Sequence, residues 1–311
     1  MDTELLQKVN NANKDLSYKD AIEIIEYDFK KLASIENKSF KRKNYEYGKN
    51  VILNWFEWQK INIELEDNDK QNGWKEGYAP DNCWSSETLY RIYKKLDWCE
   101  CKIYSDAINS FFTTYTFAIH TFEDELTALN DNSVVFGQSG KDYISLRKLL
   151  KDDKFHNYTT INTFECLQTL AKLTHTIGNF TPCFDGEFNS TKGVLPDVKD
   201  YLPLMVDKIE KCLEENIGIL DKTSNKNISV RTLLEWKKFL INNREKFFLE
   251  DYYYVQKQNE NEKIIGIPLF KTQSIKHPIP NKEELEECIK EINKRIYNRG
   301  LKIVCKIISK N

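Results

Sequence analysis

Glycine and proline are scarce in this sequence. They number 11 and 7 among 311 residues, about half of the share that these two residues have in average proteins. Turn-dense all-β folds need many such residues, so the scarcity disfavours them. We expect a mainly α protein that forms a single multi-helix domain over residues 1–311, with few or no short strands. Within this domain, residues 1–80 are a candidate N-terminal helical subregion, and residues 100–311 are expected to form the core.

The sequence also lacks a charge excess and a long apolar run. Lys and Arg total 46 against 48 for Asp and Glu, which leaves a net charge of -2 and disfavours a dedicated nucleic-acid binder. No stretch reaches the roughly 18 apolar residues of a membrane span, and the first residues do not resemble a signal peptide. We therefore expect a cytoplasmic protein whose partner is a protein, with no membrane contact and nucleic acid as the less favoured alternative.

Residues that bind metals or activate nucleophiles are few and dispersed. The sequence has 4 histidines and 8 cysteines, and the close pair Cys99 and Cys101 has no histidine nearby to complete a zinc site. Cys166, Cys212 and Cys288 each fall within a helical apolar pattern, which indicates buried reduced thiols. Phosphate-binding glycine loops and nucleophile elbows are absent from the sequence. We expect no cofactor.

Apolar residues recur with the period of an α-helix in several segments. The spacing predicts helices at about 18–35, 100–130, 160–176, 198–214, from 229 onward and at the C-terminus, with one strand at 264–270. The residue types favoured at helix starts include Ser17 or Asp20, Thr159 or Thr160, Asp197 or Asp200, and Ser229. Pro203 fits the first turn of its helix, and Gly300 is a candidate kink in the last one.

The segment 178–197 has neither helical nor strand periodicity, although it lies between two well-patterned helices. An irregular loop of about twenty residues in a compact helical protein is usually functional or disordered, and the apolar content here argues for function. Gly178 is expected to end the preceding helix in the left-handed conformation, and Asn179 to bond the following turn. The candidate binding residues in and around the loop are Phe180, Phe184, Lys192, Asp200 and Trp236.

The string HTIGNFTP, followed by an FN pair, KG and DYLPLM, resembles the central signature of a widespread set of uncharacterised bacterial proteins. In these proteins a helix ends in T-I-G-N-F, and an Asp-Tyr pair opens the next helix. The resemblance extends through Trp236 and FFLEDYYYV to the I-x-x-R-G motif that runs from Ile296 to Gly300. The family has no assigned activity, so the resemblance implies an architecture and no mechanism.

The same segment is also similar, more weakly, to HNH-type nuclease domains, which contain an I-G-N-L segment followed by a second Asn. That similarity implies a divalent metal and a histidine base that activates water. It would make His175 or His156 the base and Asn179 a positioning residue, with Asn189 and either Asp185 or Glu187 at the metal. The acidic-His-Pro start of the nuclease motif is missing, and the periodicity puts His175 at a helix end instead of on a hairpin.

Three functional hypotheses follow. The leading one is a non-enzymatic interaction protein that recognises another macromolecule, with a role in phage-host conflict. The first alternative is the metal-dependent nuclease centred on residues 175–200, and the second is a protein that binds a small ligand beside Trp236. Against all three stands a purely structural interpretation, in which His175 bonds a helix-end carbonyl and Asn179 and Asn189 only stabilise turns.

Overall fold

The computed structural model describes residues 3–12, 16–29, 87–99, 105–111, 113–115, 118, 164–184, 188, 201–221, 226–258, 261–269 and 282–310. Of these residues 60% are helical and 14% lie in strands, so the described part of the chain is mainly α, as expected. The helices are α1 (Thr3–Asn11), α2 (Tyr18–Ile25), α5 (Glu87–Lys95), α10 (Glu165–Leu173), α12 (Leu202–Glu214), α13 (Val230–Asn243) and α14 (Lys282–Ser309).

The strands of the described residues form small antiparallel sheets of two strands each. The pairs are β1 (Ser105–Ala107) with β2 (Phe180–Pro182), β3 (Ile219–Asp221) with β4 (Lys226–Ile228), and β5 (Tyr253–Gln258) with β6 (Asn261–Gly266). The strand expected at 264–270 is therefore only partly present, because β6 ends at Gly266. Pro268 lies two residues further on and has no N–H to extend the ladder.

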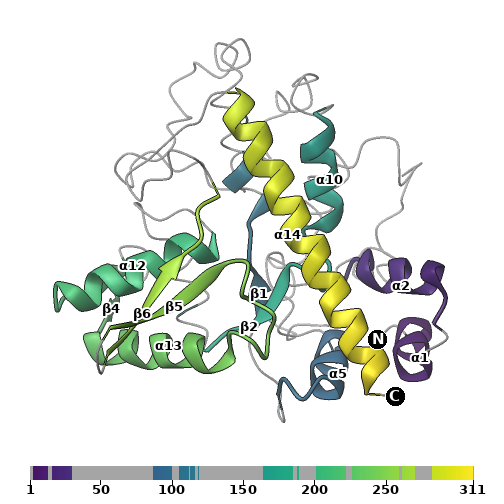
Figure 1. Cartoon of the computed structure of the whole chain (residues 1–311), viewed down its shortest axis with the longest axis horizontal. Helices are drawn as coiled ribbons and strands as arrows, with labels where there is room; N and C mark the ends of the chain where they lie inside the picture. The colour runs from purple at the N-terminus through teal and green to yellow at the C-terminus, as the bar shows by residue number, and fades with distance from the viewer. Residues whose placement is uncertain are drawn as a thin grey trace, which may run out of the picture.

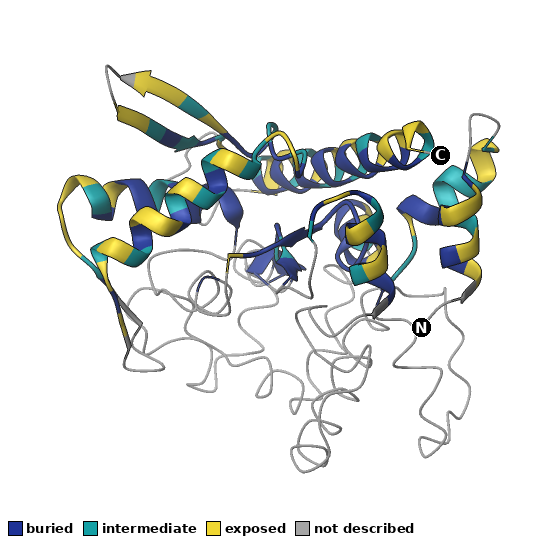
Figure 2. Cartoon of the chain, turned by 90° about the horizontal axis from the view of Figure 1, so that it is seen from below, coloured by how far each residue is buried: buried dark blue, intermediate teal, exposed yellow. Residues whose placement is uncertain are grey.

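The long helix α14 organises the described part of the chain. It has 28 residues, and it packs along α10 and then against α2, as Figure 1 shows. Its apolar residues recur at three- and four-residue spacing, and the buried ones include Leu285, Ile289, Ile292, Ile296, Ile303 and Ile307. Figure 2 shows this buried side facing the rest of the molecule, with exposed residues on the outer side.

Gly300, the candidate kink, lies where α2 packs against α14. The helix α14 continues through this position without a break. A Cβ atom added to Gly300 would lie 3.0 Å from Cγ2 of Ile25, tighter than an ordinary van der Waals contact. The glycine therefore lets α2 approach α14 closely, and helical geometry is kept on both sides of it.

Two of the expected helix starts are confirmed and two are wrong. Ser17 caps α2 by accepting from Asp20 N–H, and Ser229 caps α13 by accepting from Thr232 N–H. By contrast, α10 has Phe164 and α12 has Tyr201 at the N-cap, with no side-chain cap in either case. Pro203 does lie in the first turn of α12, where it removes one N–H group that a cap would otherwise satisfy.

The helix predicted at 100–130 does not begin where the periodicity placed it. Ser105–Ala107 forms strand β1, which pairs with β2 in the register Asp106 opposite Thr181. Helical backbone is described only from Phe111 onward. Pairing with a strand about seventy-five residues away in the chain outweighs the local helical pattern at this point.

The first predicted helix, at 18–35, is shorter than its apolar pattern suggests. The helix α2 ends at Ile25, and Glu26 is its C-cap. The chain then turns toward α10, where Phe29 N–H donates to the carbonyl oxygen of His175 at 3.1 Å. This contact joins the N-terminal part of the chain to the segment that was singled out as a candidate site.

Candidate functional site

The T-I-G-N-F segment is a buried turn that leads from α10 into β2. Residues 174–183 are all buried, and Thr174 is the C-cap of α10. The turn is held by backbone hydrogen bonds, since both Asn179 N–H and Phe180 N–H donate to the carbonyl oxygen of Thr176, at 3.0 Å and 3.1 Å. His175 is thus placed just after a helix, as the periodicity predicted.

The amide side chain of Asn179 is fully used by the fold. Its Oδ1 accepts from the N–H of Asn109 at 3.0 Å. Its Nδ2 donates to the carbonyl oxygens of Asn109 and Thr174, both at 2.9 Å. Asn179 is completely buried, so the contacts with Asn109 stabilise the place where β1 meets the turn after α10. The predicted hydrogen bond between Asn179 and the turn is the one to Thr174 O. Both amide hydrogens of Asn179 are bonded to main-chain oxygens.

His175 lies in different surroundings from Asn179. Its imidazole is 6% exposed, and its Nδ1 is 3.6 Å from Oδ1 of Asp28. The ring stacks on that of Phe180, with centroids 6.1 Å apart and an angle of 9° between the planes. His175 therefore faces the N-terminal segment, while Asn179 faces β1. In the described residues the two side chains do not converge on one site.

The glycine of the segment is required by a close approach to α14. A Cβ atom on Gly178 would lie 2.2 Å from the carbonyl oxygen of Ile296, far inside van der Waals contact. The left-handed conformation expected for Gly178 is wrong, because its φ does not lie in the positive range. The lack of a Cβ atom, and not a special backbone conformation, is what this position needs.

Arg299 is the centre of the buried region, a role that sequence reasoning missed. The residue is 0% exposed. Its Nη1 donates to the carbonyl oxygens of Ile177, Gly178 and Phe180 at 3.0, 2.9 and 2.8 Å, in the turn after α10. The sequence does contain a sign of this burial, because Arg299 continues the helical spacing of Ile292 and Ile296 on the apolar face of the last helix.

The remaining contacts of Arg299 fix the plane of its guanidinium. Nε donates to the carbonyl oxygen of Phe247 at 2.9 Å, and the guanidinium carbon lies 5.4 Å from the centroid of the Trp98 ring. Burial lowers the pKa of Arg299, and the nearby hydroxyls of Tyr252 and Tyr93 oppose that shift. The guanidinium thus joins α14, the turn after α10, the segment after α13 and the residues after α5.

The other candidate residues divide into core residues and residues outside the described part. Phe180 and Trp236 are fully buried, and Trp236 packs edge-on against Phe188 at 5.1 Å. Phe184 is 39% exposed and contacts Phe239 at 5.6 Å. The positions that fall outside the described residues are His156, Asp185, Glu187, Asn189, Lys192, Asp197 and Asp200.

The cysteines and the acidic residues give no metal site within the described ranges. The three helical cysteines Cys166, Cys212 and Cys288 are buried and form no disulfide there, which confirms the interpretation of their pattern. Burial raises the pKa of the Cys166 thiol to about 12, so its thiolate is disfavoured. Among the described residues, no group of three or more His, Cys, Asp or Glu side chains could hold a metal ion.

The hairpin β5–β6 is anchored to α12 by two buried carboxylates. Ile264 N–H donates to Glu210 at 3.0 Å, and Gly266 N–H donates to Asp207 at 2.7 Å. These N–H groups belong to the edge of β6 that faces away from β5. A Cβ atom on Gly266 would lie 2.3 Å from the carbonyl oxygen of Pro203. The glycine and the two carboxylates together let α12 cover this edge closely.

The opposite edge, on β5, is open over its outer half. In an antiparallel pair, every second residue of a strand directs its backbone N–H and C=O away from the partner strand. Ile264 and Gly266 do so on β6, and the residues paired with Gly266, Ile264 and Glu262 therefore do so on β5. These residues are Tyr253, Val255 and Lys257. Tyr253 uses its carbonyl oxygen to accept from Arg244 Nε at 2.7 Å. For Val255 and Lys257, no hydrogen bond to the outward backbone groups occurs within the described structure.

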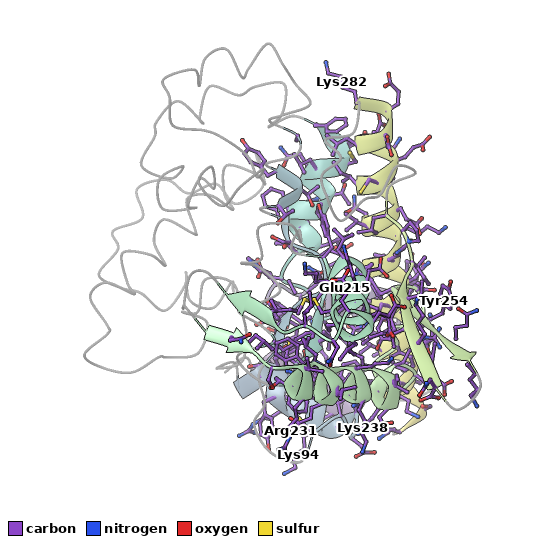
Figure 3. The ribbon with its side chains drawn as sticks, turned by 90° about the vertical axis from the view of Figure 1, so that its left-hand side faces the viewer. Lys94, Glu215, Arg231, Lys238, Tyr254 and Lys282 are labelled. Atoms are coloured by element: carbon purple, nitrogen blue, oxygen red, sulfur yellow. The ribbon has the colours of Figure 1, made fainter. Side chains whose placement is uncertain are left out.

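The open part of β5 lies at the surface. Figure 2 shows the hairpin projecting beyond the helices beside it, with exposed residues toward its tip. Lys257 is exposed, and the Tyr254 side chain is 44% exposed. Figure 3 shows Tyr254 on the outer side of the hairpin, away from α13. Tyr254 pairs across the hairpin with Ile265, which is partly buried.

Comparison with models of protein families, with curated proteins and with solved structures finds no match for this chain. The resemblances to the T-I-G-N-F proteins and to HNH-type nucleases therefore stay predictions. In the described residues, no helix is both long and apolar enough to cross a membrane.

Proposed function

We propose that this protein is a non-enzymatic interaction protein that binds an extended segment of another protein by adding it as a third strand to the β5 edge. The observation that carries the proposal is the open backbone edge at Val255 and Lys257, on a hairpin whose other edge is covered. An extended peptide is the ligand whose hydrogen-bonding groups repeat at the same spacing as those of a strand edge.

The hairpin is suited to this role because it is held in place before any partner arrives. Glu210 accepts from β6 and from Lys237 Nζ, the latter at 2.8 Å, and both side chains are largely buried. Asp207 holds the base of the same strand. A strand that is already ordered loses little conformational entropy on binding, so more of the interaction energy is kept as affinity.

Side chains beside the edge would add specificity. Tyr254 offers an exposed aromatic ring on one face of the hairpin. Lys257 offers a positive charge on the other face, near the tip. Strand addition takes its affinity mainly from the backbone and its selectivity from alternate side chains, so these two residues would favour a segment that carries an apolar and an acidic residue.

The proposal is tested with two substitutions at one position. Lys257→Pro removes the outward N–H group without removing an N–H from the β5–β6 ladder, which tolerates proline at such edge positions. Lys257→Ala, the matched control, removes the side chain and keeps the N–H. We expect peptides selected from a displayed random library to bind the Pro variant at least about tenfold more weakly than the Ala variant, because both variants lack the lysine charge and only the Pro variant lacks the N–H.

Two outcomes would overturn the proposal. One is a Pro variant that folds as the wild type does, by circular dichroism, and binds the selected peptides with unchanged affinity. The other is a wild-type dimer in sedimentation that becomes monomeric in the Pro variant, because the β5 edge would then be occupied by a second copy of the chain.

A Gln256→Pro variant should lose hairpin order, since the N–H of Gln256 points into the β5–β6 ladder.

A further inference from the structure

Arg244 lies at the inner end of the open β5 edge. It is the C-cap of α13, and its Nε donates to the carbonyl oxygen of Tyr253 at 2.7 Å. That carbonyl points away from β6, because Tyr253 pairs with Gly266, whose own N–H bonds outward to Asp207. The guanidinium of Arg244 therefore lies on the side of β5 where a third strand would be added.

Arg244 also limits how far a third strand can extend along β5. The carbonyl oxygen of Tyr253 already accepts from Arg244, and the N–H of Tyr253 donates to the carbonyl oxygen of Leu249 at 3.4 Å. The outward groups that stay open begin two residues further on, at Val255. An added segment can therefore follow the edge between Lys257 and Val255. It must end or turn away beside Arg244, since the next bonding position is taken.

The guanidinium of Arg244 keeps hydrogen-bond donors for a ligand at this point. Its Nη2 makes one long bond, to the carbonyl oxygen of Glu250 at 3.4 Å, and its Nη1 donates to no atom of the described structure. The carboxylate of Glu250 lies 3.7 Å from Nζ of Lys302 on α14, and no carboxylate of the described residues forms an ion pair with Arg244. A partly exposed arginine fork with unused donors is suited to bind a carboxylate.

The direction of the added segment decides which of its ends meets Arg244. A segment antiparallel to β5 runs from Lys257 toward Val255 and reaches Arg244 with its carboxyl end. A parallel segment reaches Arg244 with its amino end, and a terminal ammonium beside a guanidinium is disfavoured by like charge. Antiparallel pairing is also slightly more stable per residue. Charge and backbone geometry thus favour the same direction.

We propose that Arg244 binds the C-terminal carboxylate of the partner segment, which is added antiparallel to β5 and ends beside Tyr253. This inference rests on the proposed strand addition, and it names the end of the partner that is recognised. A terminal carboxylate fits better than an acidic side chain, because the chain that follows an internal residue has to turn away from the occupied Tyr253 carbonyl. The Nη nitrogens donate charge-assisted hydrogen bonds to it, which are stronger than those between neutral groups.

The test combines two forms of a peptide with variants of the full chain. Peptides are selected on the wild type from a random library displayed with free C-termini, and each is synthesised as the free acid and as the C-terminal amide. In Arg244→Gln, the side-chain nitrogen takes the place of Nε and can still donate to Tyr253, while both Nη donors are lost. Arg231→Gln is the matched control, because it changes an arginine of α13 whose side chain is 89% exposed.

Amidation is expected to weaken binding to the wild type and to Arg231→Gln by about tenfold or more. Arg244→Gln is expected to weaken binding of the free acid by a similar factor. The amide should bind the wild type and Arg244→Gln equally, which also shows that the β5 edge is intact in this variant. Fluorescence anisotropy of labelled peptides gives the dissociation constants.

Three results overturn the carboxylate inference. They are equal binding of acid and amide to the wild type, a difference between acid and amide that persists in Arg244→Gln, and binding that depends on an internal acidic side chain instead of the terminus. The strand addition survives each of them if the peptides still bind Lys257→Pro more weakly than Lys257→Ala. A selection that yields no peptide, or only peptides that bind these two variants equally, contradicts the strand addition and the carboxylate inference together.

Discussion

Nη1 of Arg299 donates a hydrogen bond to the carbonyl oxygen of Gly178 at 2.9 Å, across 121 residues of sequence. The same two residues are the ones that bring α14 and the turn after α10 into contact. Gly178 makes the approach possible because it has no side chain, and Arg299 makes it favourable because its guanidinium satisfies carbonyl oxygens that water cannot reach.

Arg299→Lys should destabilise the protein strongly. A lysine ammonium cannot reproduce the fork that donates from both Nη1 and Nε, and it would bury a charge with fewer partners, at a cost of about 3 kcal/mol or more. Urea unfolding followed by circular dichroism gives the change. Arg231→Lys is the control, because Arg231 has a side chain that is 89% exposed. Equal stability of the two variants would contradict the role of Arg299.

Gly178→Ala should be more damaging than Gly300→Ala. The new methyl group meets a backbone oxygen at 2.2 Å in the first case and a side-chain methyl at 3.0 Å in the second. Backbone cannot move aside easily, so we expect a loss of about 2–3 kcal/mol at position 178 and a smaller loss at position 300. Thermal unfolding of both variants tests the order, and a reversed order would contradict it.

Asn179→Ala should cost about 2–4 kcal/mol, because it leaves buried backbone groups of Asn109 and Thr174 without partners. Asn243→Ala is the matched control, since its Nδ2 makes a single bond to Phe239 O in a partly buried site. Hydrogen exchange should show lost protection in β1 for the first variant only. An Asn179→Ala variant with wild-type stability would contradict the structural role and revive a functional one.

Asp207→Asn should remove a pH dependence that Asp207 contributes to stability. Burial raises the pKa of Asp207, against the opposing effects of Gly266 N–H and Lys263. A carboxyl whose pKa is raised on folding stabilises the folded state below its unfolded pKa, and that stabilisation is lost as the pH rises through the folded pKa. The wild type should therefore lose stability relative to Asp207→Asn as the pH is raised from 3 toward 7.

Urea unfolding at several pH values checks this sign. Asp97→Asn provides the opposite case, because the hydrogen bond from Lys310 lowers the pKa of Asp97. There the wild type should gain relative stability as the pH rises up to the range in which a carboxyl ordinarily titrates, with no further gain above it, and salt should weaken the effect at this exposed site. The same slope in both variants would contradict the assignment for Asp207.

The helices were the most predictable part of the structure. The three- and four-residue spacing of apolar residues located α10, α12, α13 and α14, and the hydroxyls of Ser17 and Ser229 marked two helix starts correctly. These features depend on contacts within one or two turns, which the sequence contains directly. The irregular segment predicted at 178–197 is described over residues 178–184 and 188, where it continues the buried turn after α10 into strand β2.

The start of β1, the lengths of the helices and the roles of the signature residues depended on partners far away in the chain. Ser105–Ala107 continued a helical pattern but pairs with β2. Asn179 was a candidate for positioning a reaction, yet its amide bonds the backbone of Asn109. A sequence pattern does not report which distant segment comes to lie beside a residue, and such contacts decide which groups its side chain bonds.

The scarcity of glycine and proline, with the helical spacing of apolar residues, determined by itself that this protein is mainly α, because helix formation rests on local geometry. Only the tertiary structure decided why glycine is needed at position 178 and why an arginine is buried at position 299. Gly178 is needed where Ile296 approaches, and Arg299 is tolerated in the core only because carbonyl oxygens from several segments surround its guanidinium. Both depend on packing across the chain, which no local pattern specifies.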